Sequence, residues 1–234
     1  MVNPILVALD VDNAEQAEHL ARSVYRYVGG FKVGLQLVMA EGPGVVGRIA
    51  RLGKPVFADL KLHDIPNTVR GAATAMAAQG ARWITAHAAG GREMIEAAVA
   101  GLQIGSTDQI GLLGVTVLTS MDESALATVG ITPDVSAQVR RLSDLSSSAG
   151  AEGVICSPSE TPVVKAVDSG LLAVTPGIRS PNDKADDQKR INTPAEAMRL
   201  GADLLVIGRS ITAAANPAEA AEAIQASLKT PGQV

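Results

Sequence analysis

Short apolar runs recur along the whole chain, and the segments between them have helical spacing or helix-start signals. Each run has the length expected of a buried strand. There are eight such runs: Ile5–Asp10, Phe31–Leu37, Pro55–Leu62, Trp83–Ala89, Gly111–Thr119, Gly153–Ser157, Leu171–Ile178 and Leu204–Ile211. Strict strand–helix alternation without a linker predicts a single (β/α)8 TIM barrel over residues 1–234. A doubly wound sheet is the alternative, but eight units closing at this length favour the barrel.

Capping signals mark where several of these helices begin and end. Asp12-Asn13-Ala14-Glu15 precedes apolar positions with helical spacing. Thr193-Pro194-Ala195-Glu196 and Asn216-Pro217-Ala218-Glu219 each place a capping residue, a first-position proline and an acidic first turn. Glycines close other helices, at Gly53, Gly80, Gly150, Gly170 and Gly201.

Charged residues gather at the end of the third predicted strand. Side chains at i and i+2 share one face of a strand, so Asp59 and Lys61 point the same way and the intervening leucine points the other. Asp64 lies just past the strand end. Two carboxylates around one ammonium, set among apolar neighbours, are costly to bury. The pattern therefore suggests a functional site, although a structural ion pair remains open for Asp-x-Lys alone.

Other polar residues also fall where barrel strands end, which is where the active sites of such barrels lie. Lys32 comes early in its strand and must reach up the barrel interior to join them. His87 is either a ligand-facing group or a buried core histidine. The remaining candidates are Asp10, Thr119, Ser120, Arg179, Gly208 and Arg209.

The last two strand ends suggest an anion site. Loops after strands seven and eight often hold a phosphate in these barrels, and Arg209 adds a planar fork of donors. An arginine on the protein surface without a ligand is the alternative.

The segment of residues 179–190 is long, polar and free of apolar periodicity. It is either a solvated loop or a lid over a bound anion.

Composition narrows the function further. Apolar residues make up 47% of the chain and aromatic residues 2%, which suits parallel strands buried on both faces. The formal charge of −4 argues against nucleic-acid or membrane binding. The single cysteine, Cys156, is expected in the core and fits a reducing compartment. With no signal peptide or apolar span, we expect a soluble cytoplasmic protein.

Metal binding is not expected. The three histidines are scattered and form no zinc-type cluster. Asp10, Asp59 and Asp64 could in principle bind magnesium through oxygen. Lys61 argues against it, because its ammonium already compensates the neighbouring carboxylates.

The stretch Asp59-x-Lys61-x-x-Asp64-Ile65-Pro66-Asn67-Thr68 closely resembles the signature of the orotidine 5′-monophosphate decarboxylase family. The resemblance covers the whole chain and is closest to the bacterial-type branch. The Asp-x-Lys-x-x-Asp core is shared with barrel decarboxylases that act on sugar phosphates. The complete set of motifs is more specific; the others are Ala8-Leu9-Asp10, Phe31-Lys32-Val33-Gly34, Val117-Leu118-Thr119-Ser120, Thr175-Pro176-Gly177-Ile178-Arg179, Gln188 and Val206-Ile207-Gly208-Arg209.

This resemblance implies a role for each matching residue. Lys61 would protonate the pyrimidine carbon, Asp59 would face the departing carboxylate, and Lys32 would complete the charge array. Asp10 and Asp64 would bind ribose hydroxyls, and Thr119 and Ser120 would contact the pyrimidine. The phosphate would be bound by Arg179, Gln188, Gly208 and Arg209. In a homodimer, the site of the second subunit would receive Asp64, Ile65 and Thr68. No metal or organic cofactor is implied.

Two other functions remain open from the residues. One is a magnesium-dependent sugar-phosphate decarboxylase or aldolase with the same core motif. The other is a barrel that binds nucleotides without turning them over.

Overall fold

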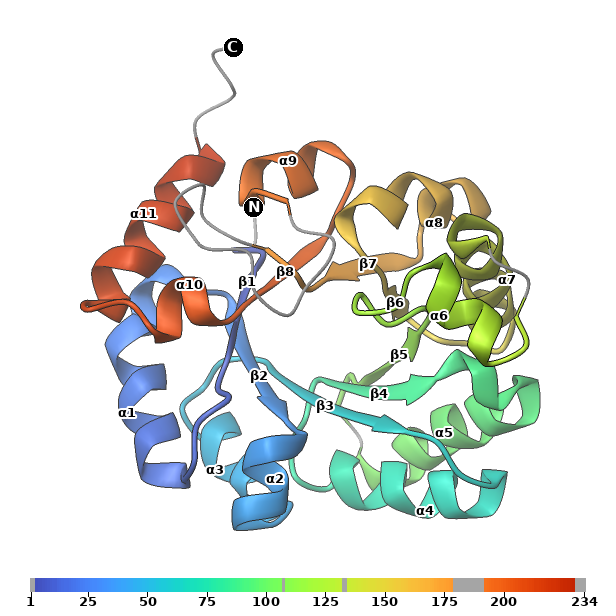
Figure 1. Ribbon diagram of the computed structural model, residues 1–234. Coiled ribbons are helices and arrows are strands. Elements are labelled where there is room, and N and C mark those ends of the chain that lie inside the picture. The colour runs from blue at the N-terminus through green and yellow to red at the C-terminus, as the bar shows by residue number, and fades with distance from the viewer. Residues whose placement is uncertain (1–2, 107, 132–133, 179–191, 230–234) are drawn as a thin grey trace.

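Eight parallel strands form a closed barrel in which each strand pairs with the next along the chain and β8 pairs with β1 (Figure 1). The computed structural model describes residues 3–106, 108–131, 134–178 and 192–229. The strands are β1 (Ile5–Ala8), β2 (Gly30–Gly34), β3 (Val56–Leu62), β4 (Trp83–His87), β5 (Gly111–Val115), β6 (Gly153–Ile155), β7 (Leu172–Thr175) and β8 (Leu204–Ile207). The predicted (β/α)8 barrel is confirmed.

Helices surround the barrel on its outside (Figure 1). They are α1 (Ala14–Val24), α2 (Leu35–Glu41), α3 (Gly44–Ala50), α4 (Pro66–Ala77), α5 (Arg92–Gly105), α6 (Glu123–Thr128), α7 (Val135–Ser148), α8 (Thr161–Val167), α9 (Pro194–Arg199), α10 (Arg209–Thr212) and α11 (Pro217–Lys229). Short 3-10 turns lie at Tyr25–Tyr27, Ala88–Gly90 and Pro158–Glu160. None of the helices in these described ranges is long and apolar enough to cross a membrane.

The predicted caps at the helix starts are present, whereas Gly170 does not close α8, whose C-cap is Asp168. The side chain of Asn13 accepts a hydrogen bond from the Gln16 amide at the start of α1. Thr193 accepts from the Glu196 amide at the start of α9, and Asn216 accepts from the first amides of α11. These bonds satisfy amides that have no partner within the helix itself.

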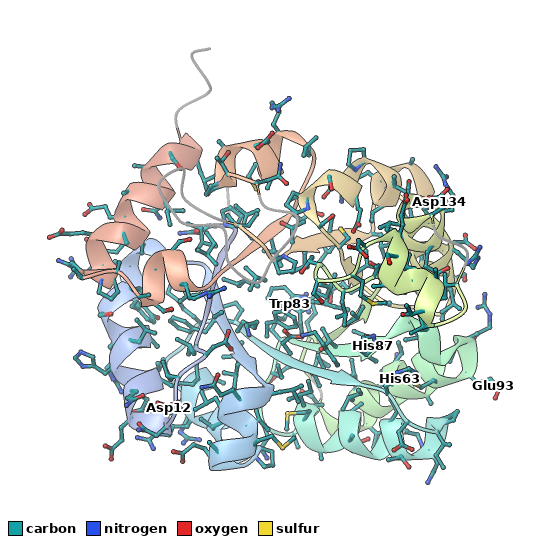
Figure 2. All side chains as sticks on the ribbon, viewed as in Figure 1. Asp12, His63, Trp83, His87, Glu93 and Asp134 are labelled. Atoms are coloured by element: carbon teal, nitrogen blue, oxygen red, sulfur yellow. The ribbon has the colours of Figure 1, made fainter. Side chains whose placement is uncertain are left out.

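Alternate residues of the strands build two apolar layers. Outward-facing side chains such as Val7, Ile84 and Ile207 pack against the helices. Inward-facing side chains fill the barrel interior: Leu6, Ala8, Phe57, Trp83, Leu113, Val115, Ile155, Val174 and Val206. Trp83 lies near the centre of the ring of strands (Figure 2). The interior is therefore a packed core rather than a channel.

Several strands end earlier than the apolar runs predict. β5 ends at Val115 rather than Thr119, and β8 ends at Ile207 rather than Ile211. Residues beyond the strand ends remain buried by packing under helices and loops, as Val117 (5% exposed) and Ile211 (0%) show. A run of apolar residues indicates that the segment is buried. Because burial continues after strand pairing stops, the run extends beyond the end of the strand.

Candidate active site

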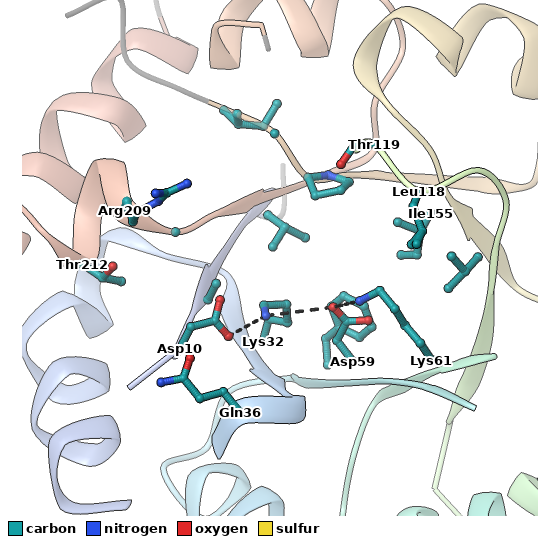
Figure 3. A pocket seen from close by; sticks show the side chains of 18 of the residues that line it. Asp10, Lys32, Gln36, Asp59, Lys61, Leu118, Thr119, Ile155, Arg209 and Thr212 are labelled. Carbon is teal, nitrogen blue, oxygen red and sulfur yellow. Dashed lines mark hydrogen bonds and ion pairs between the residues drawn. The ribbon is translucent and has the colours of Figure 1, made fainter. Parts of the chain in front are cut away.

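Four charged side chains form a row across the carboxyl ends of the first three strands (Figure 3). Asp10 follows β1, Lys32 lies on β2, and both Asp59 and Lys61 lie on β3. Lys32 Nζ lies 2.8 Å from Asp10 Oδ1 and 4.0 Å from Asp59 Oδ2, and Lys61 Nζ lies 2.7 Å from the same Asp59 oxygen. We call these four residues the charge row. Its charges alternate in sign, so each one is stabilised by its neighbours.

The charge row is partly withdrawn from solvent. The side chains of Lys32 and Asp59 are 10% and 13% exposed, and that of Lys61 is 29% exposed. Asp10, at the outer end, is 48% exposed. Charges held at these depths have lost part of their hydration, so their mutual attraction is stronger than it would be on the surface.

The backbone at Lys61 is unusual. Lys61 has a φ of 51°, in the left-handed region, and among the described residues it is the one non-glycine residue with a positive φ. The pairing of β3 with β4 shifts register between Ala58 and Leu62. Strand alternation correctly placed Asp59 and Lys61 on the same side, but this irregularity was not predictable from it. Strained backbone of this kind tends to concentrate at functional sites.

Two further residues support the charge row: Thr85, which sequence reasoning missed, and Gly34, which belongs to a predicted motif but had no role assigned. The hydroxyl of Thr85 on β4 accepts a hydrogen bond from the Lys61 amide and donates one to Asp59 Oδ1. Gly34, at the end of β2, leaves room for the row. A Cβ there would lie 2.8 Å from Lys32 Nζ and 2.9 Å from Asp10 Oδ1. A β-branched residue in a strand and a glycine at a strand end are too common to signal either role.

The charge row lines one side of a cavity of about 490 Å³ at the mouth of the barrel. Its floor and far wall are largely apolar, formed by Phe57, Val115, Val117, Leu118, Ile155, Pro176, Ile178 and Val206. This volume is typical of a small-molecule site, and a few converging charges in an apolar pocket are the usual arrangement there.

Gly208 and Arg209 line the cavity where α10 begins. They follow β8, the strand that pairs with β1, so they lie next to the Asp10 end of the charge row (Figure 3). Arg209 is exposed and is the first residue of this helix. The apolar run had predicted that it would lie late in the eighth strand. Thr119 and Gln36 also line the cavity. The cavity therefore has an arginine near the Asp10 end of the charge row, with Lys61 at the other end of the row.

The remaining candidates lie elsewhere. Ser120 is exposed and does not line the cavity. Asp64, Ile65 and Thr68 are also exposed and outside it, between β3 and the first turn of α4. Arg179, Gln188 and the predicted lid at residues 179–190 lie outside the described residues.

Two histidines lie beside the site. The rings of His63 and His87 stack at a tilt of 33°, with centroids 5.3 Å apart (Figure 2). His87, at the end of β4, is half-buried. Burial lowers its pKa, and the nearby His63 and Lys61 lower it further. His87 is not among the residues that line the cavity, so the structure favours a structural role over ligand contact.

Cys156 is fully buried, as predicted, and burial raises the pKa of its thiol to about 12. Within the described ranges, no three His, Cys, Asp or Glu side chains gather in a way that would hold a metal ion.

Comparison with known proteins identifies the family. A family model described as "Orotidine 5'-phosphate decarboxylase / HUMPS family" matches residues 3–224. The chain belongs to this family. Its membership of the orotidine 5′-phosphate decarboxylase family, predicted from the motifs, is thereby confirmed.

Relatives within the family are similar over nearly their full length. The orotidine 5′-phosphate decarboxylase of Anaeromyxobacter sp. (strain K) is 52% identical over 225 residues, covering 96% of this chain and 97% of that protein. That of Paramagnetospirillum magneticum is 47% identical, covering 97% and 99%. A crystal structure of orotidine 5′-phosphate decarboxylase from Lactobacillus acidophilus has a TM-score of 0.85 at 36% identity, covering 97% and 100%. The prediction of an orotidine 5′-phosphate decarboxylase, an enzyme of the carboxy-lyase class, is confirmed.

Proposed function

We propose that this enzyme converts orotidine 5′-monophosphate to uridine 5′-monophosphate and carbon dioxide, with Lys61 protonating the pyrimidine C6 carbanion. The reaction is the last step of de novo uridine 5′-monophosphate synthesis, and we place it in the cytoplasm. The main support is the charge row on the wall of an apolar cavity. This arrangement combines an ammonium with a carboxylate beside a space large enough for a ligand.

The chemistry of this decarboxylation fits the charge row. Loss of carbon dioxide leaves negative charge on a ring carbon that has no conjugated electron sink. The ammonium of Lys61, fixed 2.7 Å from Asp59, stabilises that developing charge and supplies the proton that replaces the carboxylate. Preorganised charge of this kind is usually the largest single contribution to catalysis.

Asp59 contributes through repulsion. A substrate carboxylate about 4 Å away would interact with it by roughly 4 kcal/mol at an effective dielectric of about 20. That repulsion is relieved as carbon dioxide leaves. Lys32, 4.0 Å from Asp59 and 2.8 Å from Asp10, holds the two carboxylates in place.

The rest of the nucleotide spans the cavity. Asp10, half exposed at the outer end of the row, binds ribose hydroxyls, and Thr119 and Ser120 contact the pyrimidine. Gly208 and Arg209 bind the phosphate at the start of α10, and we keep Arg179 and Gln188 as further phosphate ligands. Binding energy from the remote phosphate can then order the reacting end of the substrate.

We further propose that the working unit is a homodimer in which Asp64, Ile65 and Thr68 reach the second subunit's site, where Asp64 binds a ribose hydroxyl. Their exposure outside their own cavity supports this arrangement. Large apolar side chains are also exposed next to the ends of β2 and β3: Leu35 (44%), Met39 (77%) and Ile65 (67%). Exposed apolar side chains at the rim of a site are typical of interaction surfaces.

The first experiment is a decarboxylation assay on orotidine 5′-monophosphate, followed by ultraviolet absorbance with and without a chelator. We expect turnover that the chelator does not change. Loss of activity with chelator would favour the magnesium-dependent sugar-phosphate enzyme, and tight product binding without turnover would favour a binding barrel.

Lys61→Ala should lower kcat by more than the ~10²–10⁴ typical of general acid–base catalysis alone. Near wild-type turnover in that variant would refute the role of Lys61.

A second experiment tests the phosphate site. Arg209→Ala should raise KM by roughly 10- to 100-fold, the equivalent of the ~1.5–3 kcal/mol expected for a hydrogen bond to a charged group. Arg199→Ala is the matched control, because Arg199 is an exposed arginine on α9 that does not line the cavity. An equal KM in both variants would move the phosphate elsewhere.

A third experiment tests sharing between subunits. Lys61→Ala and Asp64→Ala chains should each be inactive alone. A mixture that forms heterodimers should regain activity, because one of its two sites then has both residues intact. Confirmed heterodimers without any recovery would contradict sharing.

A further inference from the structure

The hydroxyl of Thr85 joins two catalytic elements of β3. Thr85 lies in the middle of β4, and its side chain is fully buried. The Lys61 amide donates to Thr85 Oγ1 at 2.8 Å, and that hydroxyl lies 3.0 Å from Asp59 Oδ1. An amide only donates and a carboxylate only accepts, so the hydroxyl must donate its single proton to Asp59. Both hydrogen bonds therefore have a fixed direction.

The backbone needs this hydroxyl at Lys61. The register shift between Ala58 and Leu62 and the positive φ of Lys61 take its amide out of the regular pairing with β4. A buried amide without a partner is costly, and irregular strand positions commonly use a side chain instead. Thr85 supplies that partner from the neighbouring strand.

The carboxylate of Asp59 is held from both sides. Its Oδ2 accepts from Lys61 Nζ at 2.7 Å, while its Oδ1 accepts from Thr85. Lys61 is thus held at its backbone by Thr85 and at its ammonium by Asp59. The three residues form a closed loop of hydrogen bonds, which fixes the plane of the carboxylate and the start of the lysine side chain.

We infer that Thr85 is a positioning residue for the decarboxylation, aligning Asp59 and Lys61 without touching the substrate. This inference rests on the roles proposed above for those two residues. Catalytic charges are effective only when held in the productive geometry, and a misplacement of about 1 Å can cost roughly 10²-fold in rate. Thr85 takes no part in any covalent step.

The test compares Thr85→Val, which removes the hydroxyl and keeps the shape, with Thr85→Ser, which keeps the hydroxyl. We expect Thr85→Val to lower kcat by roughly 10- to 100-fold with KM changed less than threefold. Thr85→Ser should stay within about threefold of wild type, the size of effect expected when the hydrogen bonds remain. If the valine variant does not fold, Thr85→Ala serves in its place with the same expectations.

Two controls separate positioning from general stability. Thr116→Val removes the hydroxyl of another buried threonine, which donates to the Ile155 carbonyl and lies outside the cavity lining. It should lose stability in urea unfolding but keep its kcat. In an Asp59→Ala background, Thr85→Val should cost much less activity than it does alone, because coupled residues are not additive.

The outcomes are distinct. If the wild type is active, two results overturn the inference and leave the proposed function intact. One is an unchanged kcat in Thr85→Val. The other is a kcat in Thr85→Ser as low as that in Thr85→Val. Additive losses in the Asp59→Ala background also overturn it. A wild type that does not decarboxylate orotidine 5′-monophosphate overturns both.

Discussion

The left-handed backbone of Lys61 leads to a prediction that contradicts the ordinary rule for glycine. In a regular strand, glycine is less stable than alanine by roughly 0.5–1 kcal/mol, because it loses more conformational freedom on folding. At a φ of 51° the order should reverse, since a Cβ in the left-handed region costs about 1–2 kcal/mol. We therefore compare Lys61→Gly with Lys61→Ala. Both remove the ammonium and its contact with Asp59, so those losses cancel.

From these two terms, Lys61→Gly should be more stable than Lys61→Ala by about 1 kcal/mol, equivalent to about 2–4 °C in Tm for a chain of this size. The assay is urea unfolding at one protein concentration, with free energies from linear extrapolation. Leu60→Gly and Leu60→Ala form the control pair, because Leu60 is on the same strand and has a negative φ. There alanine should be the more stable. An alanine variant as stable as the glycine variant at position 61 would refute the strain.

Three further predictions concern buried groups and close packing. Cys156 should resist a thiol reagent in the native enzyme at pH 8 and react fully in denaturant, because burial raises its pKa to about 12; rapid native labelling would contradict this. Gly101→Ala should lower the unfolding free energy by about 1–3 kcal/mol, since the added Cβ would lie 2.4 Å from the Arg70 carbonyl oxygen, and an unchanged urea midpoint would refute it. Burial lowers the pKa of His87, so the unfolded state binds more protons as pH falls through about 6.5, and stability drops there. In His87→Gln the drop measured by unfolding across this range should be smaller, and equal slopes would argue against the shift.

The barrel was predictable because its strands are buried on both faces and its helices carry local signals. Runs of valine, leucine and isoleucine mark the strands, and caps such as Asn13 and Thr193 mark helix starts. Several strand ends were not predictable, although β3 ends at Leu62 as expected. Burial continues past them, so Ile211 looks like strand but lies in α10.

The charge row was partly predictable, because residues two apart on a strand share a face. Spacing along β3 placed Asp59 and Lys61 together, while Lys32 required the three-dimensional register of β2 to join them. Thr85 was not predictable from spacing. Its contribution depends on which residue of β4 lies opposite the irregular part of β3, and no local pattern in Trp-Ile-Thr-Ala-His encodes that alignment.

The packed interior of the barrel also limits how protons reach the site. Leu6, Phe57 and Trp83 fill the space below the cavity with apolar side chains, so water approaches Lys61 from the open mouth. Under the proposed function, a nucleotide bound in the cavity would lie between that ammonium and the solvent. Under the proposed function, Lys61 therefore regains its proton from bulk water after the product has left, and each turnover transfers a single solvent hydrogen to carbon without further exchange.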